Sequence, residues 1–232
     1  MSIFIQTLFD TDTSTLTYIV HDVKSKDAII IDPVWNYDPR TSTLSKESIN
    51  NVLEYVLQEK LKVHWIIETH AHADHVTGAQ VIKAKIPNVQ IGIGSRICEV
   101  QSIFKKLFHL GDDFIPDGSQ FDLLISDVNS FSAGTLRIKP ISTPGHTPAC
   151  MSYLIEDCVF TGDALFMPDF GTGRCDFPAG SAKELYFSIH ENLYSLPHKT
   201  RVFTGHDYQP NGRKLLYEST IEEQKNNNIH LK

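Results

Sequence analysis

The sequence predicts an α/β fold in which helices cover β-sheets, and two observations lead to this prediction. Short runs rich in β-branched and aromatic residues, such as Ile3–Phe9 and Thr15–Val23, are typical of strands. These runs occur in groups that alternate with single segments of helical periodicity, as in residues 49–57. At 232 residues the chain is long enough for one large domain or two small ones, and no internal repeat or linker divides it.

The first half of the chain is expected to open as a β-meander and then to alternate strands with helices. Its predicted strands are Ile3–Phe9, Thr15–Val23, Ala28–Ile31, Val63–Glu68 and Val89–Ile93. Its predicted helices are a segment capped by Ser45 that runs to about residue 57, a segment from about Val76 to Lys85 that stops at Pro87, and residues 95–108. The proline-bearing stretch 32–43 and the glycine-bearing stretch 110–118 are expected to be loops.

The second half is expected to add a second group of strands and to end in helices. Its predicted strands are Phe121–Ile125, Leu136–Ile141, Met151–Ile155, Val159–Thr161 and Arg201–Thr204. A capping box over 181–184 predicts a helix that runs to about Tyr194. A closing helix is expected from Arg213 to roughly Asn227.

Composition and charge exclude several classes of protein. Hydrophobic residues make up 41% and charged residues 21% of the chain, as in an ordinary globular protein. The net charge of −7 argues against a general surface for nucleic acid or anionic membrane, so a small anionic substrate needs a local cationic patch. No secretory signal and no apolar run of about 18 residues is present. The four cysteines lack close pairs, which predicts reduced thiols and a cytoplasmic location.

Three imidazoles and a carboxylate stand within six consecutive residues directly after the predicted strand 63–68: His70, His72, Asp74 and His75. Imidazole nitrogen and carboxylate oxygen are preferred ligands for zinc and iron. The alternative is that Asp74 only caps the next helix and the histidines lie on a polar loop. Four such groups repel or desolvate one another unless a cation neutralises them, so we favour a metal site.

Three more candidate ligands each follow an apolar strand and a glycine: His146, Asp163 and His206. Glycine before each ligand permits a tight turn and a close backbone approach. Taken singly, each could be an ordinary loop or turn residue. Taken together with the group at 70–75, they make a full ligand set.

In this order, the motifs Thr-His-x-His-x-Asp-His, Pro-Gly-His-Thr, Thr-Gly-Asp and Gly-His-Asp resemble the metallo-β-lactamase fold superfamily. The resemblance covers essentially the whole chain. It implies a single domain over residues 1–232, built as an αββα four-layer sandwich with a metal site at one edge.

For a dinuclear member, the resemblance implies one metal on His70, His72 and His146 and a second on Asp74, His75 and His206, with Asp163 bridging. The metals would be two zinc ions or a mixed iron and zinc pair. A bound hydroxide would then serve a thioester hydrolase of the glyoxalase II type.

The segment Gly173-Arg174-Cys175-Asp176-Phe177 instead resembles the persulfide dioxygenase branch of the superfamily, in a bacterial-type variant. Its best-known form has Thr where this chain has Cys175. Glyoxalase II enzymes carry a Gly-Arg-Phe-Phe-Glu-Gly-like segment here and append a helical domain after the last ligand. In this chain little more than one predicted helix follows His206.

That branch implies one Fe(II) per chain, held by the catalytic residues His70, His146 and Asp163 as a facial triad. His72, Asp74, His75 and His206 would then orient ligands and hold water. The implied reaction oxidises glutathione persulfide, or a related low-molecular-weight persulfide, with O2 to sulfite and thiol. A metal-dependent binding or regulatory domain is the third reading, although such domains usually lose ligands.

Substrate contacts are expected from Arg174, Tyr208 and Arg213, with Lys214 as a further cation. The alternatives are an ion pair of Arg174 with an aspartate and a solvated helix start at Arg213. Three roles are open for Cys175: a small buried residue, a residue that lines a pocket, or a reactive thiol. The resemblance also raises the expectation of a homodimer. The histidines outside the motifs are expected to be structural or exposed: His21, His64, His109, His190, His198 and His230.

Overall fold

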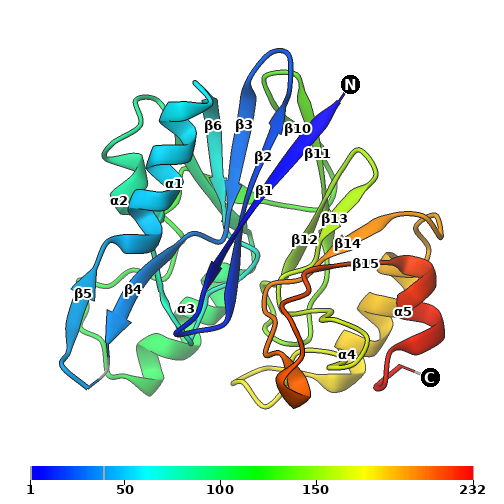
Figure 1. The fold of residues 1–232 in the computed structure, drawn as a ribbon. Helices are drawn as coiled ribbons and strands as arrows, with labels where there is room; N and C mark the ends of the chain where they lie inside the picture. The colour runs from blue at the N-terminus through cyan, green and yellow to red at the C-terminus, as the bar shows by residue number, and fades with distance from the viewer. Residues whose placement is uncertain (1, 39, 232) are drawn as a thin grey trace.

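The computed structural model describes residues 2–38 and 40–231 as two six-stranded sheets between outer helices (Figure 1). The first sheet has the order β1-β2-β3-β6-β8-β9, and the second has the order β10-β11-β12-β13-β14-β15. A small third sheet, β5-β4-β7, stands beside the first. This arrangement confirms the predicted four-layer αββα sandwich.

The strands of the first and third sheets come from the first 125 residues. Their bounds are β1 Ile3–Asp10, β2 Thr15–Asp22, β3 Asp27–Ile31, β4 Val34–Asp38, β5 Thr43–Ser45, β6 Lys62–Ile67, β7 Val76–Thr77, β8 Gln90–Gly94 and β9 Leu123–Ile125. Those of the second sheet are β10 Phe131–Ala133, β11 Leu136–Ser142, β12 Met151–Ile155, β13 Cys158–Phe160, β14 Arg201–Phe203 and β15 Glu218–Thr220.

The helices divide between the two outer faces, with α1 and α2 outside the first sheet and α4 and α5 outside the second (Figure 1). Their bounds are α1 Glu47–Gln58, α2 Ala79–Lys83, α3 Ile97–Leu107, α4 Ala182–Phe187 and α5 Ile221–Asn227. A π-helical turn over Ser188–Leu193 continues α4. In the described part of the chain, no helix is both long and apolar enough to cross a bilayer.

Alternating side chains build three stacked cores. On β3, Ile29 and Ile31 enter the core between the sheets, whereas Ala28 and Ile30 pack against α1 and α2. This is the two-residue period of a strand that is buried on both faces. On the far side, Val159 and Val202 of the second sheet pack against α4, the π-helical turn and α5.

Two expectations for the region before α1 were wrong. Residues 34–38 form strand β4 rather than a loop, because Trp35 and Tyr37 pair across to β7 and β5. Pro39, in the same stretch, lies outside the described residues. Ser45 ends β5 and does not cap α1; instead Asn36 of β4 accepts the backbone N–H of Ser48 at 2.8 Å, in the first turn.

Two predicted helices were too long. Val76–Thr77 is strand β7, because its backbone pairs with β4, so only Ala79–Lys83 is helical. The predicted closing helix begins at Ile221 rather than Arg213, because residues 218–220 pair with β14 as β15. Its true start carries a capping box in which Thr220 and Glu223 bond each other's backbone N–H groups.

Candidate metal centre

The predicted ligands lie together because the strands before them end at one edge of the sandwich. In the first sheet β3 and β6 are parallel, and His70 follows the end of β6. In the second sheet β11, β13 and β14 run in the same direction, since β12 is antiparallel to both β11 and β13 and β14 is parallel to β13. These strands deliver His146, Asp163 and His206 respectively.

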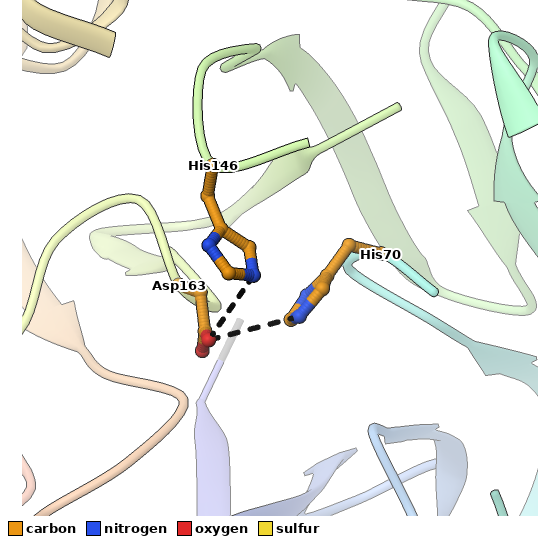
Figure 2. Close-up of side chains that lie close together, drawn as sticks. All are labelled: His70, His146 and Asp163. Atoms are coloured by element: carbon orange, nitrogen blue, oxygen red, sulfur yellow. Dashed lines mark ion pairs between the residues drawn. The ribbon is translucent and has the colours of Figure 1, made fainter. Parts of the chain in front are cut away.

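Two imidazoles converge on one carboxylate oxygen. Asp163 Oδ2 lies 3.5 Å from His146 Nε2 and 3.7 Å from His70 Nε2 (Figure 2). One potential ligand atom from each of the three residues lies within 4.8 Å of the others. All three residues are buried, with His70 only 1% exposed. Their atoms are close enough to share one cation.

The hydrogen bonds of the two histidines leave Nε2 free to coordinate. His146 Nδ1 must donate to the carbonyl oxygen of Arg174 at 2.7 Å, because a carbonyl can only accept. The Thr69 hydroxyl donates to Asp32 Oδ2 at 2.7 Å, so it accepts from His70 Nδ1 at 2.9 Å. Bonds of this kind fix the tautomer and the ring orientation of metal-ligating histidines.

The protein itself leaves polar atoms of this cluster unsatisfied. His70 Nε2, His72 Nδ1 and His75 Nε2 are buried and find no hydrogen-bond partner within residues 2–38 and 40–231. Such orphaned atoms are costly unless another group satisfies them. Burial and the charges of the neighbouring histidines lower the pKa of His70 well below its ordinary value, so its imidazole is neutral and offers a lone pair. The residues therefore fit a divalent metal.

A second group of predicted ligands adjoins the first. Asp74 Oδ2 lies 2.9 Å from His75 Nδ1 and 3.6 Å from His206 Nε2, and His206 Nε2 lies 3.3 Å from Asp163 Oδ1. The Thr15 hydroxyl donates to Asp74 at 3.2 Å. Burial opposes ionisation of Asp74, but the hydrogen bond from His75 and the nearby histidine charges hold its pKa well below the usual range. Asp163 thus stands between the two groups.

His72 faces a different pair of carboxylates. Its Nε2 lies 3.2 Å from Asp32 Oδ1 and 3.2 Å from Glu68 Oε2. Burial lowers the pKa of His72, but these two carboxylates outweigh it and raise the pKa well above the ordinary value. His72 is therefore anchored beside the His70–His146–Asp163 cluster, with Nδ1 as its unpartnered atom.

Sequence reasoning missed Asp32 as part of the site. Asp32 accepts the backbone N–H of Thr69 at 2.7 Å, the Thr69 hydroxyl and His72, so one buried carboxylate orients both His70 and His72. The sequence did contain a sign of this role, because Asp32 directly follows the apolar strand 28–31. In the same way, Asp163 follows strand 158–160 after a short turn. The absence of a glycine before Asp32 hid the similarity.

A cavity of about 480 Å³ opens beside the cluster, and His146 and Asp163 form part of its wall. Arg174, an expected substrate contact, lines this cavity; its Nε lies 3.6 Å from Asp176 Oδ1 and its guanidinium stands over the Phe177 ring. Tyr208, another expected substrate contact, also lines it and stacks on His206 with an interplanar angle of 9°.

Arg213, the third predicted substrate contact, does not line this cavity. Its guanidinium bonds both oxygens of Asp169 and both oxygens of Asp207. These bonds explain why the pKa of Arg213 is raised, and they bind a surface loop to the end of β14. Its role in substrate binding stays a prediction.

The structure adds detail to what the sequence suggested for two further residues. His230, expected to be structural or exposed, is exposed but also lines the cavity. Cys175 lines a smaller neighbouring cavity, and burial together with Asp176 raises the pKa of its thiol. A raised pKa means less thiolate, which argues against the reactive-thiol reading.

Known proteins are similar to this chain in sequence and in architecture. A family model described as the metallo-beta-lactamase superfamily matches residues 10–206. "Glyoxylase B2" of Dictyostelium discoideum is 43% identical over 95% of this chain and 76% of its own length. A probable metallo-hydrolase of Burkholderia pseudomallei is 41% identical over 98% of this chain and 80% of its own length. Human "Persulfide dioxygenase ETHE1, mitochondrial" is 32% identical over 99% and 76%. The crystal structure of ETHE1 from Myxococcus xanthus superposes with a TM-score of 0.78 at 30% identity, over 98% of this chain and 84% of that one.

Proposed function

The chain belongs to the metallo-beta-lactamase superfamily, and from this premise we propose that it is a persulfide dioxygenase with one Fe(II) per chain. The single observation that supports this best is the grouping of His70, His146 and Asp163 around one point. Two histidines and one carboxylate with open positions are the donor set of non-haem iron oxygenases. The similarity to persulfide dioxygenases over nearly the whole chain also supports the proposal.

The proposed reaction converts a persulfide, O2 and water into a thiol, sulfite and protons. The terminal sulfur is oxidised, O2 is reduced, and the sulfur–sulfur bond breaks while the thiol takes up a proton. Both atoms of O2 end on sulfur, and water supplies the third oxygen of sulfite. When bound, the ferrous ion would supply the redox chemistry and bring the sulfur and O2 together.

The chain's own residues hold and shield this site. The Arg174 carbonyl and the Thr69–Asp32 pair fix the rings of His146 and His70, so that each Nε2 points to Asp163. Aromatic side chains of the cavity exclude water from the reacting sulfur. Asp74 and His206 stand beside Asp163 and can hold a proton or a water molecule.

A thioester hydrolase of the glyoxalase II type is the second candidate. The observation that favours it is that Asp74, His75 and His206 are all present and lie beside the first cluster. Two relatives of higher identity also carry the names of a glyoxylase and a metallo-hydrolase. A hydrolase of this type needs two metals per chain and consumes no O2.

The test is oxygen uptake by protein reconstituted anaerobically with Fe(II), with glutathione persulfide as the first substrate. We expect the amount of sulfite formed to equal the amount of O2 consumed, and a zinc-loaded sample to show only background O2 uptake. Equal rates in the iron and zinc samples would refute the dioxygenase assignment. Rapid hydrolysis of S-lactoylglutathione by the zinc sample alone would support the hydrolase.

A further inference from the structure

Four aromatic side chains line the cavity beside the metal centre: Phe166, Phe170, Phe177 and Tyr208. Phe166, Phe170 and Tyr208 form one cluster, in which Phe170 and Tyr208 have ring centroids 4.8 Å apart and Phe166 meets Tyr208 edge-on at 5.9 Å. The ring centroid of Phe177, which also lines the cavity, lies 5.5 Å from that of His146. Such rings bind apolar and aromatic groups through area and stacking, and they provide few partners for charged groups.

Positive charge in the cavity is scarce. Among the described residues that line it, Arg174 is the one guanidinium or ammonium group. Arg213 is already saturated by Asp169 and Asp207 and lies outside the lining. Glutathione carries two carboxylates, so one of them would be left without a cationic partner in this cavity. An anion that loses water without gaining a partner weakens binding.

A segment near the C-terminus contributes a further polar side chain, His230, to the cavity. Residues 224–231, which we call the C-terminal strap, are fastened to the cavity-wall segment 166–172. Gln224 and Asn228, both 0% exposed, donate to its carbonyl oxygens at 2.7 and 3.1 Å. These bonds therefore hold the last residues of the strap against the cavity-wall segment 166–172.

The strap also sets the hydrogen bonding of His230. The backbone N–H of Thr172 donates to His230 Nδ1 at 3.1 Å. In the neutral ring the proton therefore sits on Nε2, which leaves this atom as a hydrogen-bond donor on a residue that lines both this cavity and its smaller neighbour. Gly171 has φ +97, and a Cβ built on it would lie 2.3 Å from this imidazole, so only glycine allows the ring to pack here.

Building on the proposed function, we infer that the preferred substrate is a persulfide with an apolar or aromatic body and a single carboxylate. The aromatic wall would hold the body, while Arg174 and His230 Nε2–H would bind the carboxylate. His230 is thus a specificity-determining residue, and glutathione persulfide is a poorer substrate than a one-carboxylate persulfide of similar reach.

The test compares three persulfides, each generated in solution from its disulfide and hydrogen sulfide: 4-carboxybenzyl, benzyl and glutathione persulfide. With the Fe(II) enzyme we expect kcat/KM for the 4-carboxybenzyl compound to exceed that for the glutathione compound about tenfold. Arg174→Gln and His230→Asn should each raise KM for the 4-carboxybenzyl compound about tenfold and leave benzyl persulfide within about twofold. Asparagine keeps an acceptor for the Thr172 N–H while removing the Nε2 donor.

Matched controls are Arg137→Gln and His198→Asn, exposed residues outside this cavity, which should behave as wild type. Binding of 4-carboxybenzyl thiol, benzyl thiol and glutathione to zinc-loaded protein is measured in parallel by calorimetry. A preference for glutathione in both assays, or equal losses for the benzyl and 4-carboxybenzyl compounds, would overturn the inference. If the thiols bind in the expected order but none of the persulfides drives O2 uptake, the preference for a ligand with an apolar body and one carboxylate stands and the dioxygenase proposal fails.

Discussion

Asp32→Asn is the substitution that most directly tests how the metal ligands are held. The carboxylate accepts from the Thr69 N–H and hydroxyl at 2.7 Å each and from His72 at 3.2 Å, and it is 2% exposed. An amide has the same shape, but one of its two positions is a donor. At least one donor of Thr69 or His72 would therefore lose its acceptor.

The expected cost follows from this arrangement. Removing one member of a buried charged pair costs about 3–5 kcal/mol, and hydrogen bonds to a charged group contribute about 1.5–3 kcal/mol each. Because the amide retains part of the bonding, we expect the free energy of unfolding to fall by about 3 kcal/mol. Freeing His70 and His72 to rotate should lower metal affinity by about 10- to 100-fold.

Asp27→Asn is the matched control, because Asp27 begins strand β3 and Asp32 directly follows its end. Asp27 bonds His64 at 2.8 Å, far along the strand from the metal centre. Unfolding would be followed by urea titration of metal-free protein, and affinity by competition with a chelator. We expect both variants to lose stability and only Asp32→Asn to lose metal affinity. Equal affinity in the two variants would refute the orienting role of Asp32.

Three further predictions concern the loop before His146, the cysteines and acid stability. Gly145→Ala should lose about 3 kcal/mol of stability and much of its bound metal, because φ is +145 and a Cβ would lie 2.4 Å from backbone atoms of α4. Gly212→Ala is the control and should cost only about 1 kcal/mol, because the space around Gly212 is open. Thermal or urea unfolding measures the stability of both variants. Because its pKa is raised, the Cys175 thiol should react with 5,5′-dithiobis-(2-nitrobenzoate) slowly at pH 7.5 and faster as the pH rises. A rapid phase of reaction at pH 7.5 that the wild type shows and Cys175→Ser lacks would contradict this. Burial opposes ionisation of Asp27, but hydrogen bonds from His64 and a backbone N–H hold its pKa below the usual range. The ionised carboxylate should therefore contribute its full stabilisation of the fold at pH 5 and lose it progressively as the pH falls below about 4. If the wild type and Asp27→Asn differ in free energy of unfolding by as much at pH 3 as at pH 5, this prediction is contradicted.

The sequence predicted the metal centre better than its surroundings. His70, His146 and Asp163 each follow a strand whose pattern is visible locally, and parallel strands bring their ends to the same edge. Asp32 obeys the same rule but lacks the glycine that marked the others. Its role therefore emerges only when β3 is seen beside β6.

The rest depends on contacts between segments that are distant in sequence. Strand β4 forms because β5 and β7 pair with it, and no local pattern announces a sheet of three short strands. His230 reaches the cavity through bonds from Asn228 and Gln224 to a loop more than fifty residues earlier. Arg213 looked like a free cation in sequence, and only the fold places two carboxylates around it.

The most direct test of the central claim is the number and kind of metals in protein purified anaerobically from its native source. One iron per chain, together with O2 consumption that matches sulfite formation, is the result expected if His70, His146 and Asp163 hold a single catalytic ion. Two metals per chain, with thioester hydrolysis and no O2 consumption, would contradict it.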